Sequence, residues 1–201
     1  GLGDVYKRQD DTEAAERVKI QYGTSMCYPV SSMGSHVSVV PNHQLNRKTP
    51  LHTRANVAYF GTFGYELDLN KLSDEEISEV KQQITFMKEY RELIQFGTFY
   101  RLKSPFEGNE TVWMTVSEDK KTALVFWYRE RNVVNADFTR VRLHGLDPDL
   151  IYRNEYNETE NYGDELMNLG LLTTDCTAGE PTSEDEPCTD YESRIYVLTA
   201  K

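Results

Sequence analysis

The chain has 201 residues, and its 33 acidic and 22 basic side chains give a formal net charge of −11. Hydrophobic residues make up 38% of it, which is enough for a packed core, while no apolar run reaches the roughly 18 to 20 residues that a membrane-spanning helix needs. An acidic chain without a stripe of Lys and Arg is a poor partner for nucleic acid, and three cysteines are too few for a disulfide scaffold.

The first nine residues, Gly1 to Gln9, contain no apolar stretch of the kind that a signal peptide requires. Their sequence, GLGDVYKRQ, resembles a translated linker or sequencing scar, and we exclude residues 1–9 from the fold prediction for that reason. We therefore expect native sequence to begin at Asp10 and the chain to be a fragment of a longer protein.

The first half of the chain is predicted to alternate helices and strands. The expected order is helix 12–22, strand 35–41, helix 53–60, strand 63–69 and helix 74–94. The last helix has the strongest signal, because Ser73 and Glu76 form a capping box ahead of an apolar stripe of about five turns. This alternation is typical of a parallel α/β sheet or barrel.

After Gln95 the apolar residues alternate in steps of two, which is the period of a half-buried strand. The segments with this pattern are 113–117, 122–131, 138–146, 150–156 and 193–200. Turn residues such as Asp147-Pro148-Asp149 separate them. The pattern predicts an antiparallel β-sandwich over 97–201, with the boundary near Gly97.

Residues 173 to 192 contain seven acidic and no basic side chains. Their Ser, Thr, Pro and Gly content predicts a solvated acidic insertion between strands. Cys176 and Cys188 stand near its ends. They could close a disulfide loop or bind a metal ion, but two free thiols in an acidic loop are the interpretation that the residues favour.

A dense acidic cluster, Asp10-Asp11-Thr12-Glu13, directly precedes the first predicted helix. One interpretation is structural: Asp10 or Asp11 is a preferred N-cap, Glu13 completes the capping box, and negative charge favours the positive end of the helix dipole. The other is functional, because the catalytic groups of a (β/α)8 barrel collect where a strand ends and its helix begins. Composition alone favours the cap.

Histidine-based sites have little support. The sequence has four histidines, which are His36, His43, His52 and His144. Their spacing matches no metal-ligand signature, so we predict no metal site. Ser35, His36 and Asp68 could be drawn as a catalytic triad, but no nucleophile elbow supports it.

The aromatic residues Tyr59, Phe60, Phe63 and Tyr65 could present flat faces to a sugar, although aromatics at this spacing more often belong to a core. The sequence contains neither a P-loop nor a dinucleotide-binding glycine motif, and we predict no cofactor. Reasoning from residues therefore gives an α/β part and a β part without assigning a reaction.

Four longer segments carry a family resemblance. They are DDTEAAERVKIQYGTSMCYPVSSMGSHVSVVPNHQ, TRANVAYFGTFGYELDLNKLSDEE, LIQFGTFYRLKSPFEGNET and GDELMNLGL. In this order they closely resemble the C-terminal part of bacterial α-galactosidases of glycoside hydrolase family 36, from Asp10 nearly to Lys201. The resemblance breaks at the acidic insertion, where the family is expected to have a shorter connection.

The resemblance implies the last helices and strands of a (β/α)8 catalytic barrel over 10–96, followed by a C-terminal antiparallel β-sandwich domain over 97–201. It also implies hydrolysis, with retention of configuration, of terminal α-linked galactose in melibiose- and raffinose-type oligosaccharides. A partial barrel would leave its two strands with open edges and an apolar face that closure normally covers. We therefore expect 10–95 to be the less stable part.

The resemblance also assigns the acid/base role to Asp10. Relatives carry that aspartate in a Ser-Asp-x-Thr-Asp motif, which reads Gln9-Asp10-Asp11-Thr12-Glu13 here. Thr12 matches the motif, and Glu13 replaces its last aspartate. Gln9 in place of Ser is explained if residue 9 belongs to the scar.

The family nucleophile is an aspartate in a Lys-Trp-Asp motif, which this chain lacks. Trp113 precedes Met114 and Trp127 precedes Tyr128, so neither tryptophan supplies it. A retaining glycosidase needs both a nucleophile and an acid/base carboxyl. We therefore expect this chain to be inactive by itself.

The resemblance implies a galactoside oligosaccharide as substrate, a homo-oligomeric parent enzyme that is often a tetramer, and a cytoplasmic location. No nucleic acid, membrane or metal partner is expected. The alternative is a non-catalytic β-sandwich module for carbohydrate binding or assembly. Its ligand would lie on an exposed aromatic face of the sandwich instead of beside Asp10.

Overall fold

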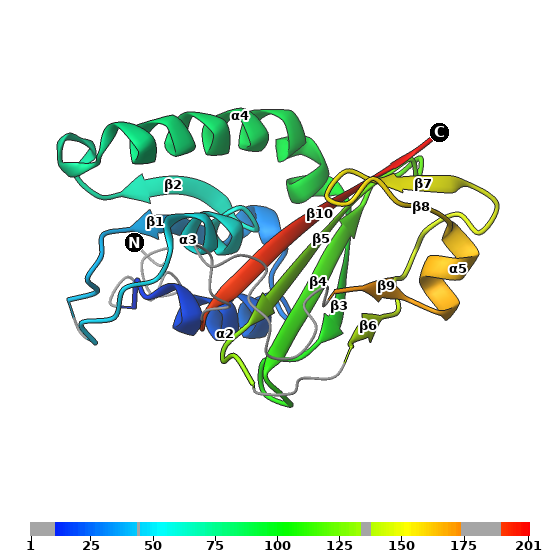
Figure 1. The fold of residues 1–201 in the computed structure, drawn as a ribbon, viewed down its shortest axis with the longest axis horizontal. Helices are drawn as coiled ribbons and strands as arrows, with labels where there is room; N and C mark the ends of the chain where they lie inside the picture. The colour runs from blue at the N-terminus through cyan, green and yellow to red at the C-terminus, as the bar shows by residue number, and fades with distance from the viewer. Residues whose placement is uncertain (1–10, 44, 134–137, 174–189) are drawn as a thin grey trace. The chain divides into compact units, whose positions relative to one another are not determined.

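The computed structural model describes residues 11–43, 45–133, 138–173 and 190–201. The chain divides into two compact units, Gly1–Phe96 (unit 1) and Gly97–Lys201 (unit 2), whose elements are labelled in Figure 1. Within the described ranges, no helix combines the length and the apolar composition needed to cross a membrane. Asp10 and the predicted scar lie outside the described residues, as do Cys176 and Cys188 of the acidic insertion.

Unit 1 alternates helices with short parallel strands, as the sequence predicts. In chain order its elements are α2 (Ala14–Thr24), the 3-10 helix η1 (Val30–Ser32), β1 (Gly34–Ser38), α3 (Leu51–Ala58), β2 (Thr62–Glu66), the 3-10 helix η2 (Leu69–Lys71) and α4 (Asp74–Phe96). β1 and β2 pair in parallel, with Gly34 opposite Thr62 and Ser38 opposite Glu66. All five predicted elements are present, and only their first and last residues differ from the predicted bounds.

The start of α4 confirms the predicted capping box. The Ser73 N–H donates to Glu76 Oε2 at 2.9 Å, and the Glu76 N–H donates to Ser73 Oγ at 3.2 Å. Three acidic residues in the first turn add negative charge where the helix dipole favours it. The apolar stripe then supplies buried residues along the helix, among them Val80, Met87 and Ile94.

The three helices of unit 1 pack against one face of the β1–β2 sheet. By register, this face carries Ser35, Val37, Phe63 and Tyr65. The Ser35 hydroxyl donates to Gln21 Oε1 of α2 at 3.0 Å, and α3 contacts both strands. The Tyr65 hydroxyl donates to Gln83 Oε1 of α4 at 2.8 Å. Figure 1 shows α4 running alongside β2.

The opposite face of this sheet is polar. It carries Gly34, His36, Ser38, Thr62, Gly64 and Glu66. The expectation of an apolar face is wrong, because the apolar residues of both strands alternate onto the side that the helices cover. The exposed His36 imidazole lies over Gly64, where an added Cβ would meet His36 Cδ2 at 2.9 Å.

Unit 2 is built on a six-stranded sheet with the strand order β3-β4-β5-β10-β7-β8. The bounds are β3 (Thr98–Lys103), β4 (Glu110–Val116), β5 (Thr122–Arg129), β7 (Ile151–Asn154), β8 (Glu160–Tyr162) and β10 (Glu192–Ala200). Every strand pair found in the described part of this unit is antiparallel, which confirms the predicted pairing mode.

A smaller second layer covers one face of the six-stranded sheet. It consists of β6 (Arg140–Val141) and β9 (Leu171–Leu172), which pair with each other, and of α5 (Gly163–Asn168). The shared core contains Val112, Met114, Val125, Trp127, Leu143, Leu146, Leu166, Tyr196 and Leu198. The second sheet is shorter than the predicted sandwich requires, since only two residues of the expected strand 138–146 form a ladder.

Candidate active site

The start of α2 is the candidate active site, because the acidic cluster of the sequence lies there. α2 begins at Ala14, and Glu13 is its N-cap, accepting a hydrogen bond from the Glu16 N–H at 3.0 Å. The prediction that Asp10 or Asp11 caps this helix is wrong, because the helix begins later. Asp11 Oδ1 instead accepts from the Glu13 N–H at 3.3 Å, forming a short turn ahead of the cap.

Glu13 is unusual as an N-cap residue because it is almost fully buried, with only 2% of its surface exposed. A buried carboxylate is costly unless donors surround it. Arg47 Nη1 donates to Glu13 Oε2 at 2.8 Å, and Thr49 Oγ1 donates to Glu13 Oε1 at 2.9 Å. With the helix N–H as a third donor, both carboxylate oxygens are bonded.

The loop between β1 and α3, which supplies Arg47 and Thr49, also holds Thr12. Asn42 Nδ2 donates to Thr12 Oγ1 at 3.3 Å, and Ser38 Oγ at the end of β1 donates to the Thr12 carbonyl at 2.5 Å. The loop is closed on itself by the Asn42 N–H, which donates to the Arg47 carbonyl at 2.9 Å. Thr12 and Glu13 are therefore attached to the C-terminal end of β1.

Arg54 of α3 also holds the loop between β1 and α3 in place. Its Nη1 donates to the Ser38 carbonyl at 2.5 Å, and its Nε donates to the Thr49 carbonyl at 3.1 Å. Burial lowers the pKa of the Arg54 guanidinium, while the charges of Glu76 and Glu79 partly oppose that effect. Because arginine stays protonated at neutral pH, the site retains this buried cation.

Asp10 itself lies outside the described residues, so its role stays a prediction. It directly precedes Asp11, and the two residues that follow are bonded at the C-terminal end of a parallel strand. In (β/α)8 enzymes that end of the strands carries the catalytic groups. The structure thus places Glu13, instead of Asp10 or Asp11, at the cap, and the functional interpretation of the acidic cluster stays a prediction.

The structure does not assemble the histidine sites. All four histidines are exposed, and no group of three or more His, Cys, Asp or Glu that could hold a metal ion occurs within the described ranges. Ser35 is buried and donates to Gln21, whereas His36 lies on the other face of the sheet. Ser35 and His36 therefore cannot act together as the nucleophile and base of a triad.

The aromatic run belongs to the core of unit 1, as its spacing favours. Tyr59 and Phe60 are 5% and 1% exposed. The Tyr59 ring centroid lies 5.1 Å from that of Phe63 and 4.8 Å from that of Phe86 on α4, and Phe63 meets Tyr65 edge-on. Burial, and then a nearby carboxylate, raises the pKa of Tyr65 to about 12. These rings bind one another and α4 instead of presenting a platform for sugar.

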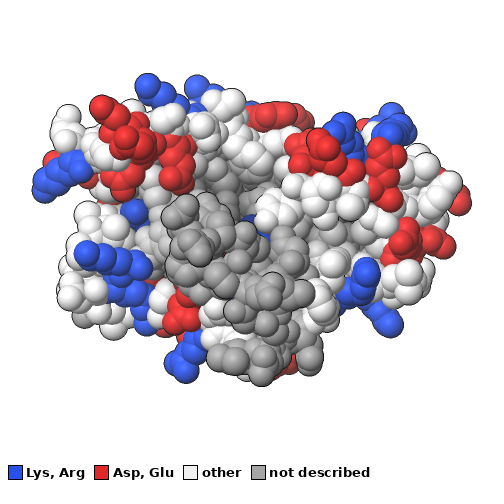
Figure 2. Space-filling model, in the orientation of Figure 1, with Lys and Arg blue, Asp and Glu red and all other residues white. Residues whose placement is uncertain are grey.

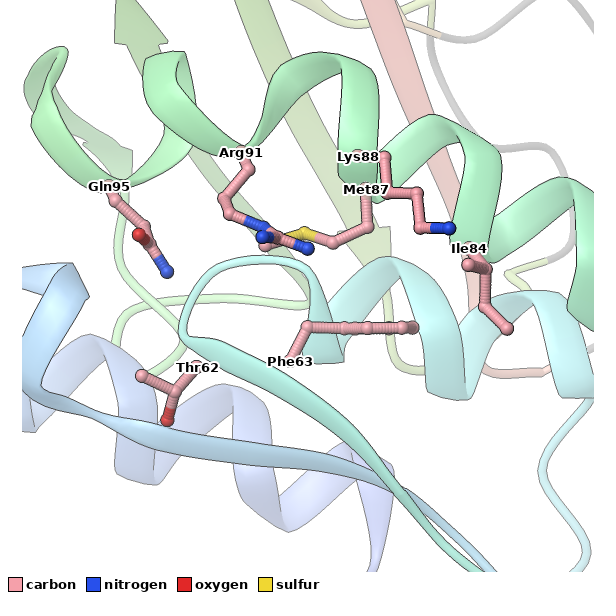
Figure 3. Close-up of a pocket in the computed structure, with 7 residues that line it drawn as sticks. All are labelled: Thr62, Phe63, Ile84, Met87, Lys88, Arg91 and Gln95. Carbon is pink, nitrogen blue, oxygen red and sulfur yellow. The ribbon is translucent and has the colours of Figure 1, made fainter.

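A pocket of about 360 Å³ lies between α4 and the start of β2. Its lining residues are Thr62, Phe63, Ile84, Met87, Lys88, Arg91 and Gln95. Figure 3 shows the Phe63 ring and the Arg91 guanidinium lying between the two elements. The pocket is at the N-terminal end of β2, whereas the acidic cluster is bonded to the C-terminal end of β1. Because β1 and β2 are parallel, these are opposite ends of the sheet, and this pocket is not the candidate site.

The charged side chains in the described part of the face in view are of mixed sign. Figure 2 shows Lys and Arg side chains interspersed with Asp and Glu, without a stripe of one sign.

Sequence reasoning missed the residues that hold the acidic cluster. Arg47, Thr49, Asn42 and Ser38 lie 26 to 36 residues further along the chain than their partners. A buried glutamate implies a cationic partner, but Glu13 reads as an exposed cap residue from sequence. No local pattern therefore points to Arg47.

Two family models match the chain in succession. The model described as Melibiase matches residues 4–97, and the model described as Glycosyl hydrolase family 36 C-terminal domain matches residues 110–198. Together they cover both compact units and leave the acidic insertion within the second match.

Individual relatives agree with the family models. The chain is 53% identical to α-galactosidase AgaA of Geobacillus stearothermophilus and 50% identical to α-galactosidase Mel36A of Lactobacillus acidophilus, over 81% of this chain and 22% of each relative. A solved structure of an AgaA variant in complex with raffinose matches with a TM-score of 0.85 and 47% identity. That match covers 94% of this chain and 25% of the solved chain, so the chain spans about a quarter of its relatives' length.

Proposed function

We propose that this chain completes a retaining enzyme that hydrolyses terminal α-linked galactose. The premise is that the chain belongs to glycoside hydrolase family 36, as the C-terminal part of an α-galactosidase. The substrates are raffinose- and melibiose-type oligosaccharides. The observation that carries the proposal is the ordered match of both units, over 94% of the chain, to an α-galactosidase that binds raffinose.

In this proposal unit 1 supplies the last two strands of a (β/α)8 catalytic barrel and unit 2 is the C-terminal β-domain. Three features of unit 1 support the assignment. β1 and β2 are parallel, helices cover only one face of their sheet, and the other face is polar. In a closed barrel that polar face would line the interior, and its C-terminal edge would form part of the substrate-binding mouth.

Asp10 is the acid/base residue of the proposed mechanism. A retaining glycosidase uses one carboxylate to attack the anomeric carbon and a second carboxyl to protonate the leaving oxygen, after which the second group activates water. Asp10 has the second role. The nucleophile comes from an upstream segment, since neither tryptophan of this chain stands in a Lys-Trp-Asp motif. The chain alone is therefore inactive.

The alternative function, a sugar-binding or assembly module, has no specific observation in its favour. Among the described residues of unit 2, the large exposed aromatic side chains are Phe106, Phe138, Tyr156 and Tyr162. They lie in separate segments of the chain. The large rings on β4 and β5, Trp113, Phe126 and Trp127, are buried instead. A binding platform would need several exposed rings on one face.

A hybrid enzyme tests the proposal. The part of AgaA that precedes the matched region is joined to residues 10–201 of this chain, and galactose release from raffinose is measured. We expect the hybrid to release galactose, while this chain alone and AgaA truncated before the matched region release none. A soluble, folded hybrid without activity, beside active intact AgaA, would contradict the proposal.

A further inference from the structure

We propose that one flank of α4 is a docking surface for a further strand and helix, which the preceding part of the parent enzyme supplies. This surface, which we call the free flank, consists of Ile84, Lys88, Arg91 and Gln95. The docked strand extends the sheet at β2, and the docked helix packs against the free flank with a carboxylate facing Lys88 and Arg91. The inference deepens the proposed function and rests on it, because a (β/α)8 barrel needs strands beyond β1 and β2.

The two flanks of α4 differ in what they contact. One flank carries Phe86 and Tyr90. The Phe86 ring centroid lies 4.8 Å from that of Tyr59, which directly follows α3, and 4.7 Å from that of Tyr90. Lys88 and Arg91 lie on the other flank, since a helix turns by about 100° per residue. Both side chains are exposed, and neither has an ion pair or a hydrogen bond with a described residue.

The outer edge of β2 lies on the same side as the free flank. α3 connects β1 to β2 and contacts both strands, so the flank of α4 that faces away from α3 lies beside the edge of β2 that faces away from β1. That edge pairs with no strand among the described residues. An open strand edge readily takes up a further strand, and in an alternating α/β sheet the accompanying helix packs on the same layer as the previous helix. A strand and a helix therefore fit this side of unit 1 together.

The pocket of about 360 Å³ lies where the free flank meets β2. Its lining combines three apolar side chains, Phe63, Ile84 and Met87, with two cations, Lys88 and Arg91 (Figure 3). An apolar side chain of a docked element gains free energy by filling such a pocket. Covering two cations that have no partner is costly, so the docked helix must bring a group of opposite charge. These two requirements define the chemistry of the partner.

Chemical labelling of Lys88 tests the inference without any substitution. An acylating reagent modifies the Lys88 amine only while the free flank is uncovered. Lys121 of the β4–β5 turn, which is also exposed, serves as the control. We expect the two lysines to react at similar rates in the full chain alone, and Lys88 to react at least about tenfold more slowly than Lys121 in the hybrid enzyme. Mass spectrometry of the labelled peptides gives both rates.

Arg91→Gln tests the charge requirement, because glutamine keeps the helix propensity of arginine and removes its charge. The substitution should lower the unfolding temperature of the hybrid and speed the labelling of Lys88 in it. In the full chain alone it should shift the unfolding temperature by no more than about 2 °C. Arg142→Gln, at an exposed arginine of unit 2, is the matched control and should be neutral in both proteins. Equal shifts for Arg91→Gln in the two proteins would overturn the charge requirement.

Three labelling results would overturn the docking surface itself. Lys88 that reacts as fast in the hybrid as in the chain alone would show that the free flank stays uncovered. Slow labelling in the chain alone that becomes slower with rising protein concentration would identify a second copy of the chain as the occupant. Protection of Lys88 by inorganic phosphate in the chain alone would identify a small-anion site.

Two further results separate this inference from the proposed function. If the hybrid is insoluble, the full chain is mixed with the preceding part of AgaA and labelled in the same way, and an unchanged rate at Lys88 overturns the inference. A soluble, folded hybrid that protects Lys88 and releases no galactose would contradict the proposed activity and support the docking surface.

Discussion

Buried polar side chains hold unit 1 together, and Gln21 of α2 shows how. It is 2% exposed. Its Nε2 donates to the carbonyls of Val57 and Phe60 at 2.9 and 3.2 Å, and its Oε1 accepts from the Ser35 hydroxyl at 3.0 Å. One side chain thus bonds the Val57 carbonyl in the last turn of α3 and the Phe60 carbonyl just after the helix, and it joins this end of α3 to β1.

Gln21→Leu should destabilise the chain by about 1–3 kcal/mol, because a buried hydroxyl and two buried carbonyls lose a partner. Urea unfolding of the full chain measures the change. Gln82→Leu is the matched control on the exposed side of α4, and it should shift the free energy of unfolding by no more than about 0.5 kcal/mol. Equal midpoints for the two variants would contradict this description of Gln21.

At the same scale, the sequence locates the acidic cluster but not its partners. The cluster can be found from sequence because four polar residues precede an amphipathic segment, while the acid/base role of Asp10 stays a prediction from the motif. The cap of α2 could not be assigned correctly, since Asp is a preferred N-cap residue and Glu is not, and the contacts that hold Glu13 at the cap come from Arg47 and Thr49, which are distant in the chain. Contacts between residues distant in the chain leave no trace in a local pattern.

At the scale of elements, the strongest local signals give the most accurate predictions. α4 begins at the predicted residue because its capping box is satisfied entirely within four residues. β5 and β10 also match their predicted segments closely, since both follow long alternating patterns.

Short elements were not predicted, for reasons that the structure makes clear. β3 follows α4 after a single residue, so its pattern merges with the end of the helical one. β8 and α5 have three and six residues, which is too short for a period to be recognised. The expected strand 138–146 ends early, because the Leu143 N–H donates to the Leu166 carbonyl and Gly145 has a φ of +77°.

Ser73→Ala should destabilise the chain by about 1 kcal/mol, because α4 loses the hydroxyl that accepts from the Glu76 N–H. Thermal or urea unfolding measures the effect. Ser78→Ala, an exposed change inside the same helix, should be neutral or slightly stabilising, since alanine is the better helix former. If both variants lose the same stability, the capping box does not stabilise α4.

At the scale of the whole molecule, the two units differ in how completely their strands are paired. Among the described residues, β1 and β2 pair only with each other, so each has an open edge. In unit 2, β4, β5, β10 and β7 each lie between two neighbours. An unpaired edge leaves backbone donors and acceptors to water and weakens the sheet.

Hydrogen exchange of the full chain should therefore be faster in β1 and β2 than in β4, β5 and β10. The expected pattern is low protection in the β1–β2 sheet with slow exchange at the centre of the six-stranded sheet, measured by mass spectrometry of peptides from each unit. Uniformly high protection in both units would contradict the view that unit 1 lacks its neighbours in this chain.

The assignment of Asp10 as the acid/base residue is the central claim, and leaving-group dependence in the hybrid enzyme tests it most directly. Asp10→Ala should lower kcat/KM for raffinose by about a hundredfold or more, while an activated aryl α-galactoside, which needs little proton donation, loses far less. Added azide should partly restore turnover of the aryl substrate where deglycosylation limits it. Near-full activity of Asp10→Ala on raffinose, or an equal loss on both substrates without azide rescue, would contradict the account.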